Sequence, residues 1–158
     1  MIPLTLRSNY SLMWGTAPIK QLCRYARRLG YDRLALTDTD NLYGLWPFLS
    51  ACRREGITPM VGAEITDPKS HRRAVCLVAD EQGYRHLCRL LTRRHMQADF
   101  DLAADLPPLA AGLVILTSNA GLLEHWHAAG LQVAAAMPRV LLSATHRLRR
   151  TAKALGSI

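Results

Sequence analysis

Short apolar runs alternate with amphipathic helical patterns along most of this chain, and this order is the feature that most restricts its fold. Four runs have the length and apolar character of buried strands: RLALT (33–37), TPMVGAEI (58–65), RAVCLVA (73–79) and LVILT (113–117). Repeated strand-then-helix order is typical of a parallel sheet with covering helices, either doubly wound or closed as a (βα) barrel. We therefore predict an α/β fold with parallel strands.

The helices are predicted from apolar spacing and from residues that begin or end a helix. Ile19, Leu22, Ala26 and Leu29 share one face of a helix over 17–30, and Gly30 ends it. A second helix begins near Trp46 and stops at Gly56. The other expected elements are a strand at 3–6, an amphipathic helix at 81–96, a loop at 97–112, a helix at 121–130, a strand near 131–136 and a helix at 143–156.

Length and composition limit the class of protein. A chain of 158 residues is long enough for one domain, and 49% hydrophobic with 20% charged residues is ordinary globular composition. No apolar run approaches the roughly 18 residues that span a bilayer, and the first residues do not resemble a secretory signal, so we expect a cytoplasmic protein with no membrane partner. The four cysteines form no CxxC pair and are expected to be buried thiols. The net charge of +8 favours an acidic partner such as nucleic acid.

Carboxylates follow two of the predicted strands. Asp38, Asp40 and Asn41 come directly after RLALT, and Glu64 lies at the end of TPMVGAEI. In parallel α/β architectures the chemistry belongs at the C-terminal ends of strands, which makes Asp38 and Glu64 candidates for a site. An Asp after a strand can equally cap the following helix, so position alone leaves both interpretations open.

Three stretches together resemble a known family: LRSNYSLMWGT, ALTDTDNLYGLWPFLSACRREGITPMVGAEI and LVADEQGYRHLCRLL. They are similar to the PHP domain at the N-terminus of the bacterial DNA polymerase III alpha subunit and of the related error-prone polymerases. The similarity is in register over 3–96 and looser over 97–158. It implies a distorted (βα) barrel with metal ligands at the strand ends. Because the last family ligands would lie beyond Ile158, we expect 1–158 to be a single, truncated PHP-like domain, an incomplete barrel.

The resemblance also gives the expected ligand positions, and most of them hold other residue types. The five departures are Thr5 and Arg7 in place of an HxH pair, Trp14 in place of an acid, and Thr39 and Arg73 in place of histidines. Glu64 alone keeps its ligand type, and Asp38 lies beside a lost histidine. We therefore predict no metal, no other cofactor and no catalytic residue, but a vestigial site made of Asp38, Asp40, Glu64, Thr5, Arg7, Thr39 and Arg73.

The chemistry of metal sites supports that prediction. A phosphoesterase with two or three metal ions needs several imidazoles and carboxylates that converge to hold the ions and activate water. Arg7 and Arg73 would instead bring positive charge to the site, and Glu64 or Asp38 could pair with them. His125 and His127 do not restore an HxH ligand pair, because residues i and i+2 of a helix point in directions about 200° apart.

Three functions remain open from the sequence. The first is a degenerate PHP module with a structural or docking role in replication or translesion synthesis, whose partners would be the remainder of a polymerase alpha chain or a proofreading exonuclease subunit. The second is a metal-dependent phosphoesterase of the 3'-5' exonuclease type, with a rearranged site of Asp38, Asp40 and Glu64. The third is a DNA-binding module that uses basic helix faces, although such faces can simply be solvated. Its candidate contacts are Arg85, Arg89, Arg93, Arg147 and Arg150. Unpaired strand edges of an open barrel would also permit a homo-oligomer.

Overall fold

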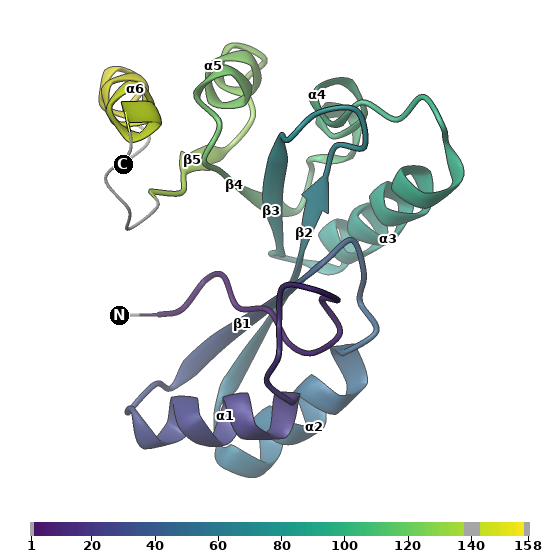
Figure 1. Cartoon of the computed structure of the whole chain (residues 1–158), viewed down its shortest axis with the longest axis vertical. Helices are drawn as coiled ribbons and strands as arrows, with labels where there is room; N and C mark the ends of the chain where they lie inside the picture. Colours follow the sequence, from purple (N-terminus) through teal and green to yellow (C-terminus); the bar gives the residue numbers. More distant parts are fainter. Residues whose placement is uncertain (1, 138–142, 157–158) are drawn as a thin grey trace. The chain divides into compact units, whose positions relative to one another are not determined.

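The computed structural model describes residues 2–137 and 143–156 (Figure 1). It shows a mixed α/β fold in two compact units, Met1–Glu64 and Ile65–Ile158, each with buried apolar residues of its own. No helix among these residues is both long and apolar enough to cross a membrane.

The first unit packs two helices against a pair of parallel strands. It contains α1 (Ile19–Arg28), β1 (Arg33–Thr39), α2 (Leu45–Glu55) and β2 (Thr58–Thr66), whose last two residues belong to the second unit. The register runs from Arg33 beside Thr58 to Thr39 beside Glu64, so the predicted site residues of the two strands end up side by side. Figure 1 shows α1 and α2 next to each other along one face of the two strands.

The core of this unit lies between the helices and the strands. Its buried residues are Ile19, Cys23, Ala26, Leu34, Leu36, Phe48, Ala51, Cys52 and Ile57. Cys23 and Cys52 face each other with their Sγ atoms 3.7 Å apart. In the second unit Cys76 is buried and Cys88 half-buried, so the prediction of buried thiols is confirmed for three of the four cysteines. Burial raises the pKa of Cys76 to about 12, which keeps this thiol neutral.

The predicted strand at 3–6 is wrong. The segment lies along β1 and accepts two backbone hydrogen bonds, from the Ala35 N–H to the Pro3 carbonyl and from the Thr37 N–H to the Leu6 carbonyl. Pro3 has no N–H to donate, and the Leu6 N–H donates to the Thr37 hydroxyl instead of to the backbone. The segment therefore accompanies β1 without forming a regular ladder.

The second unit carries the remaining elements. They are β3 (Arg73–Val78), α3 (Glu81–Met96), α4 (Leu102–Asp105), the 3₁₀ helix η1 (Pro107–Leu109), β4 (Leu113–Thr117), α5 (Ala120–Ala128), β5 (Val133–Ala135) and α6 (Ser143–Ala154). The predicted limits of the 81–96 helix and the 113–117 strand are confirmed. The side chain of Asp80 begins α3 by accepting the Gly83 N–H, and the expected loop at 97–112 contains the two short helices.

The expectation of parallel strands is confirmed for β1 with β2 and for β4 with β5, but it is wrong for β3 with β4, which are antiparallel. A single crossover helix returns the chain to the end of the sheet at which the preceding strand began, so the next strand runs parallel to it. Here the segment 97–112 follows α3 and carries the chain back again, so that the Gly112 carbonyl accepts the Ala79 N–H just past the end of β3. The strand that follows must then run the opposite way.

Candidate functional site in the first unit

Arg7 forms an ion pair with Glu64, the carboxylate near the end of β2. Arg7 Nη2 donates to Glu64 Oε1 at 2.6 Å and Arg7 Nε donates to Glu64 Oε2 at 3.2 Å, which is a two-point contact between guanidinium and carboxylate. The Glu64 side chain is only 4% exposed, whereas Arg7 is 34% exposed. The Thr39 hydroxyl also donates to Glu64 Oε2, at 3.1 Å. Of the pairings expected of Glu64 or Asp38 with Arg7 or Arg73, the one between Glu64 and Arg7 is confirmed.

The carboxylate at the end of β1 is held by serines and not by arginine. Asp38 accepts the Ser8 N–H and hydroxyl, both at 2.7 Å, and the Ser11 hydroxyl at 2.6 Å. Ser11 Oγ in turn accepts the Thr39 N–H at 3.0 Å, and because the Thr39 hydroxyl donates to Glu64, Ser11 and Thr39 together link the two carboxylates. Ser8, Ser11 and Asp38 are all buried. Asp38 thus fixes the loop that carries Arg7 against the end of β1.

The other predicted site residues of this unit lie around that centre. Asp40 has a left-handed backbone with φ of 54°, and its N–H donates to the Glu64 carbonyl at 2.8 Å. The guanidinium of Arg7 stacks over the exposed ring of Trp14, 5.5 Å from the ring centre, within the range of a cation–π contact. Thr5 is exposed and takes no part in the hydrogen bonds to Glu64 or Asp38. Arg73 belongs to the second unit.

Ser8 and Ser11 are site residues that sequence reasoning missed. The signal was their spacing: three residues apart in a turn, where the Ser11 N–H bonds to the Ser8 carbonyl and both hydroxyls reach one carboxylate. Gly15 permits the turn, because a Cβ on it would lie 2.0 Å from the Ser8 carbonyl oxygen. A buried aspartate that is not paired with an arginine needs such hydrogen-bond donors.

The residues present do not fit the metal ions that the fold family implies. Both oxygens of Glu64 accept hydrogen bonds from Arg7, both oxygens of Asp38 accept from the two serines, and no imidazole takes part in these contacts. The Arg7 guanidinium, a cation, already lies 2.6 Å from Glu64. In the described part of the chain, no three His, Cys, Asp or Glu side chains gather closely enough to hold a metal ion. A void beside Asp38 of about 10 Å³ has room for about one water molecule.

The basic residues predicted to contact DNA fall in two groups. On α3, Arg85 pairs with Glu81, Arg93 pairs with Asp105 at 3.2 Å, and Arg89 is exposed, so two of the three face a carboxylate. On α6, Arg147 and Arg150 are exposed and line a shallow hollow of about 490 Å³ with His146, Arg149 and Lys153. His125 and His127 are both exposed, and Trp126 between them in the sequence is buried.

Comparison with known proteins places this geometry in a family. The PHP domain model matches residues 3–155, and the chain belongs to that family. Among curated relatives, the DNA polymerase III subunit alpha of Treponema pallidum is 31% identical over 137 residues, which cover 74% of this chain and 12% of the polymerase. The error-prone DNA polymerase of Pseudomonas aeruginosa is 37% identical over 113 residues, covering 69% of this chain and 11% of that protein. The matched part of the chain thus spans at most about an eighth of the length of each of these relatives.

Solved structures share the fold. One is described as a candidate metal-dependent phosphoesterase from Bifidobacterium adolescentis, with a TM-score of 0.68, 15% identity and coverage of 98% of this chain and 84% of that one. Another is an amidohydrolase from Chromobacterium violaceum with bound sulfate and no metal, with a TM-score of 0.69, 16% identity and the same coverages. At these identities the likeness concerns the fold alone.

Proposed function

We propose that this chain is a degenerate PHP module of a DNA polymerase III alpha-like protein, without metal-dependent chemistry, that has a structural or partner-docking role in replication or translesion synthesis. The observation that carries the proposal is the guanidinium of Arg7 on Glu64, where a metal-binding PHP site would need a free carboxylate. The relatives support the polymerase context, because the matched segment is a small part of much longer polymerase chains.

A metal ion would have to displace Arg7 to reach Glu64. The positive guanidinium would repel a divalent cation, and the charge-assisted hydrogen bonds to a nearly buried carboxylate would be lost. Without a metal ion the site has no means of lowering the pKa of a bound water molecule. What remains is a fixed contact between the N-terminal loop and the ends of β1 and β2, which stabilises this surface of the first unit. A polymerase segment or a proofreading exonuclease subunit is the partner class we propose for the module.

The test is an assay of phosphodiester hydrolysis with added Mn²⁺, on bis(p-nitrophenyl) phosphate and on single-stranded DNA. We expect the purified chain to release no product above the protein-free blank. The matched variants are Glu64→Gln and Glu81→Gln, the second removing an exposed carboxylate on α3. Metal-dependent hydrolysis that Glu64→Gln abolishes and Glu81→Gln leaves intact would establish the rearranged phosphoesterase site instead.

Nucleic-acid binding is the second candidate, favoured by the exposed basic side chains on α6 and by the net charge. Contacts of this kind are to phosphates and would make DNA affinity fall steeply with salt. A gel-shift series with a fluorescent oligonucleotide tests it. The double variant Arg147→Gln and Arg150→Gln should weaken binding, whereas Arg27→Gln and Arg28→Gln on α1 serve as a control of equal charge.

A further inference from the structure

The second unit contains a hollow of about 410 Å³ whose lining is strongly basic. It is formed by the connection between β2 and β3 together with Arg94 from the last turn of α3. Four of its lining side chains carry positive charge, and one is a carboxylate: Lys69, Arg72, Arg73 and Arg94 against Asp67. Hollows of a few hundred Å³ are the size at which proteins bind small ligands. The charge of this one selects for anions.

The carboxylate in the lining holds the connection together. Asp67 is buried, and its Oδ1 accepts the N–H groups of Lys69 and Ser70 at 2.9 and 3.1 Å. Its Oδ2 accepts Arg72 Nη2 at 2.8 Å, and the Asp67 N–H donates to the Arg72 carbonyl at 3.0 Å. Burial by itself raises the pKa of Asp67, but the Lys69 N–H, the charge of Arg72 and the Ser70 contact outweigh it and lower the pKa below its ordinary value. Asp67 therefore stays ionised as the centre of a closed loop.

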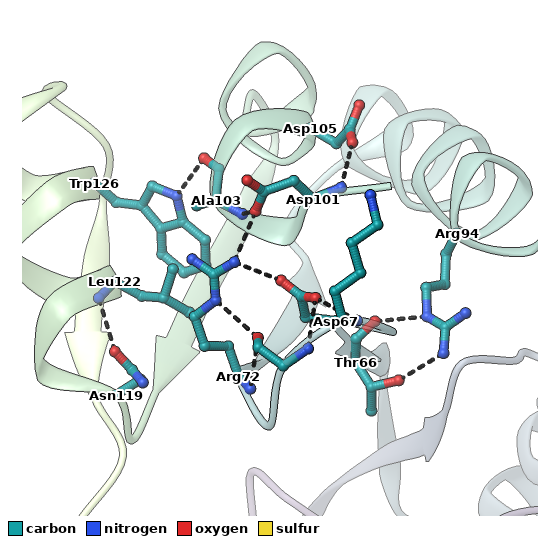
Figure 2. Close-up of polar contacts among 12 residues, drawn as sticks. Thr66, Asp67, Arg72, Arg94, Asp101, Ala103, Asp105, Asn119, Leu122 and Trp126 are labelled. Atoms are coloured by element: carbon teal, nitrogen blue, oxygen red, sulfur yellow. Dashed lines mark hydrogen bonds and ion pairs between the residues drawn. The ribbon is translucent and has the colours of Figure 1, made fainter. Parts of the chain in front are cut away.

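Arg72 and Arg94 line the hollow, and both side chains are held by hydrogen bonds (Figure 2). Arg72 reaches Asp67 and Asp101 with Nη2 and the Ser70 hydroxyl with Nε, so its charge faces two carboxylates. Arg94 binds the Thr66 carbonyl with Nε at 2.5 Å and the Thr66 hydroxyl with Nη2 at 3.0 Å. Figure 2 shows Arg94 and Arg72 on opposite sides of the segment that carries Thr66 and Asp67. Both side chains are therefore held in place before a ligand arrives.

The loop presents two further side chains toward solvent from this fixed frame. Lys69 and His71 are exposed, and each lies next to a residue that the Asp67 and Arg72 network fixes. An ammonium group donates in three directions and an imidazole can donate from its ring nitrogens, which suits the oxygens of a phosphate group. Because the loop is already ordered, binding a ligand costs little additional conformational entropy.

We propose that this hollow binds phosphate groups with a total of two or more negative charges. Lys69 and His71 would contact the phosphates, and Arg73 and Arg94 flank them. The phosphates come either from a free polyphosphate or from neighbouring positions of a nucleic-acid backbone. The site lies wholly in the second unit, its residues differ from those of the two basic helix faces, and it does not depend on the Glu64 centre.

The experiment is a calorimetric titration at low salt with two probes, inorganic pyrophosphate and a single-stranded oligothymidylate. Lys69→Gln removes one exposed charge from the hollow, and Lys20→Gln removes one exposed charge from α1 as its control. His71→Glu adds a negative charge to the hollow, and His125→Glu adds one to α5 as its control. None of the four changes a side chain that Asp67 or Arg72 binds.

We expect Lys69→Gln to weaken binding about tenfold, as loss of one charge-assisted contact does, and His71→Glu to weaken it further, with changes under about twofold in the controls. If pyrophosphate shows this pattern, the hollow takes free polyphosphates. If only the oligonucleotide shows it, the hollow takes backbone phosphates. Equal losses in the hollow variants and in their controls, for both probes, or no binding of either probe, would overturn the proposal.

Discussion

At the scale of single residues, the most consequential feature is a guanidinium on a buried carboxylate. Glu64 is a carboxylate with little access to water, and burying such a group is costly unless a cation or hydrogen-bond donors contact it. Arg7 and Thr39 supply both. Under the proposed function, Arg7 stands where the resemblance places one histidine of an HxH pair, and it brings a positive charge to the position of a bound cation.

Replacing Arg7 by Met should therefore lower the free energy of unfolding by about 1–3 kcal/mol, the cost of leaving a buried polar group without its partner. Urea unfolding monitored by circular dichroism measures this change. Arg33→Met, which removes an exposed arginine at the start of β1, should cost less than about 0.5 kcal/mol. Equal effects of the two substitutions would show that the Arg7 contact contributes nothing to stability.

Asp67 gives a prediction for the dependence of stability on pH. Its pKa is lower in the folded chain than its ordinary value of about 4, so the folded state binds this proton less readily than the unfolded state. The contribution to stability is present above pH 4 and is lost as the pH falls through the lowered pKa.

Asp67→Asn should cost about 1–3 kcal/mol at neutral pH, and the free energy of unfolding of this variant should fall less than that of the wild type below pH 4. Unfolding curves between pH 2.5 and 7 provide the measurement. Parallel pH profiles for the two proteins would contradict the assigned role of Asp67.

The family resemblance was enough to predict that Glu64 or Asp38 would pair with Arg7 or Arg73, and the contact between Arg7 and Glu64 is one of these pairings. The Asp38 contacts were not predictable in this way, because they depend on a turn that brings two serines back to β1. The basic hollow was missed for a similar reason. Arg94 is about 20 residues from the loop in sequence, and only the fold brings them together.

At the scale of elements, the tightest constraint lies where the start of α3 meets the chain that enters β4. A Cβ on Gly83 would lie 1.8 Å from the Gly112 carbonyl oxygen, which is backbone and cannot rotate away. The same Gly112 carbonyl accepts the Ala79 N–H, next to the antiparallel pairing of β3 with β4.

We expect Gly83→Ala to lower the free energy of unfolding by about 1–3 kcal/mol, the range found for overpacked sites. Gly121→Ala in α5 is the matched control, because the nearest atom to its Cβ is a side-chain oxygen 3.3 Å away, and alanine suits a helix better than glycine. Thermal unfolding should rank the control at or above the wild type. A Gly83→Ala variant as stable as the wild type would show that the two backbones do not approach this closely.

Element types followed closely from apolar spacing, since α3 and β4 have the predicted limits. Strand direction could not be predicted in the same way. Periodicity reports which face of a strand is buried, but it carries no information on which way the chain re-enters the sheet. The strand predicted at 3–6 failed for a different reason. Pro3 has no N–H for a ladder, and a short apolar run does not show that the Leu6 N–H donates to the Thr37 hydroxyl instead of to the backbone.

At the scale of the whole molecule, self-association through a strand edge remains a prediction. The segment 3–6 lies along β1, and β5 has only three residues, so neither offers a long edge to a second copy. Light scattering across a range of protein concentrations tests it. A mass that rises with concentration supports edge pairing, and a constant monomer mass counts against it.

The metal content of the purified chain, after incubation with Mn²⁺ or Zn²⁺ and removal of free ions, tests the proposed replacement of metal by arginine most directly. Elemental analysis should find well below one ion per chain, and Glu64→Gln should not change that value, because the carboxylate is already bound to Arg7. One or more ions per chain that are lost in Glu64→Gln would contradict the proposal that arginine has replaced the metal.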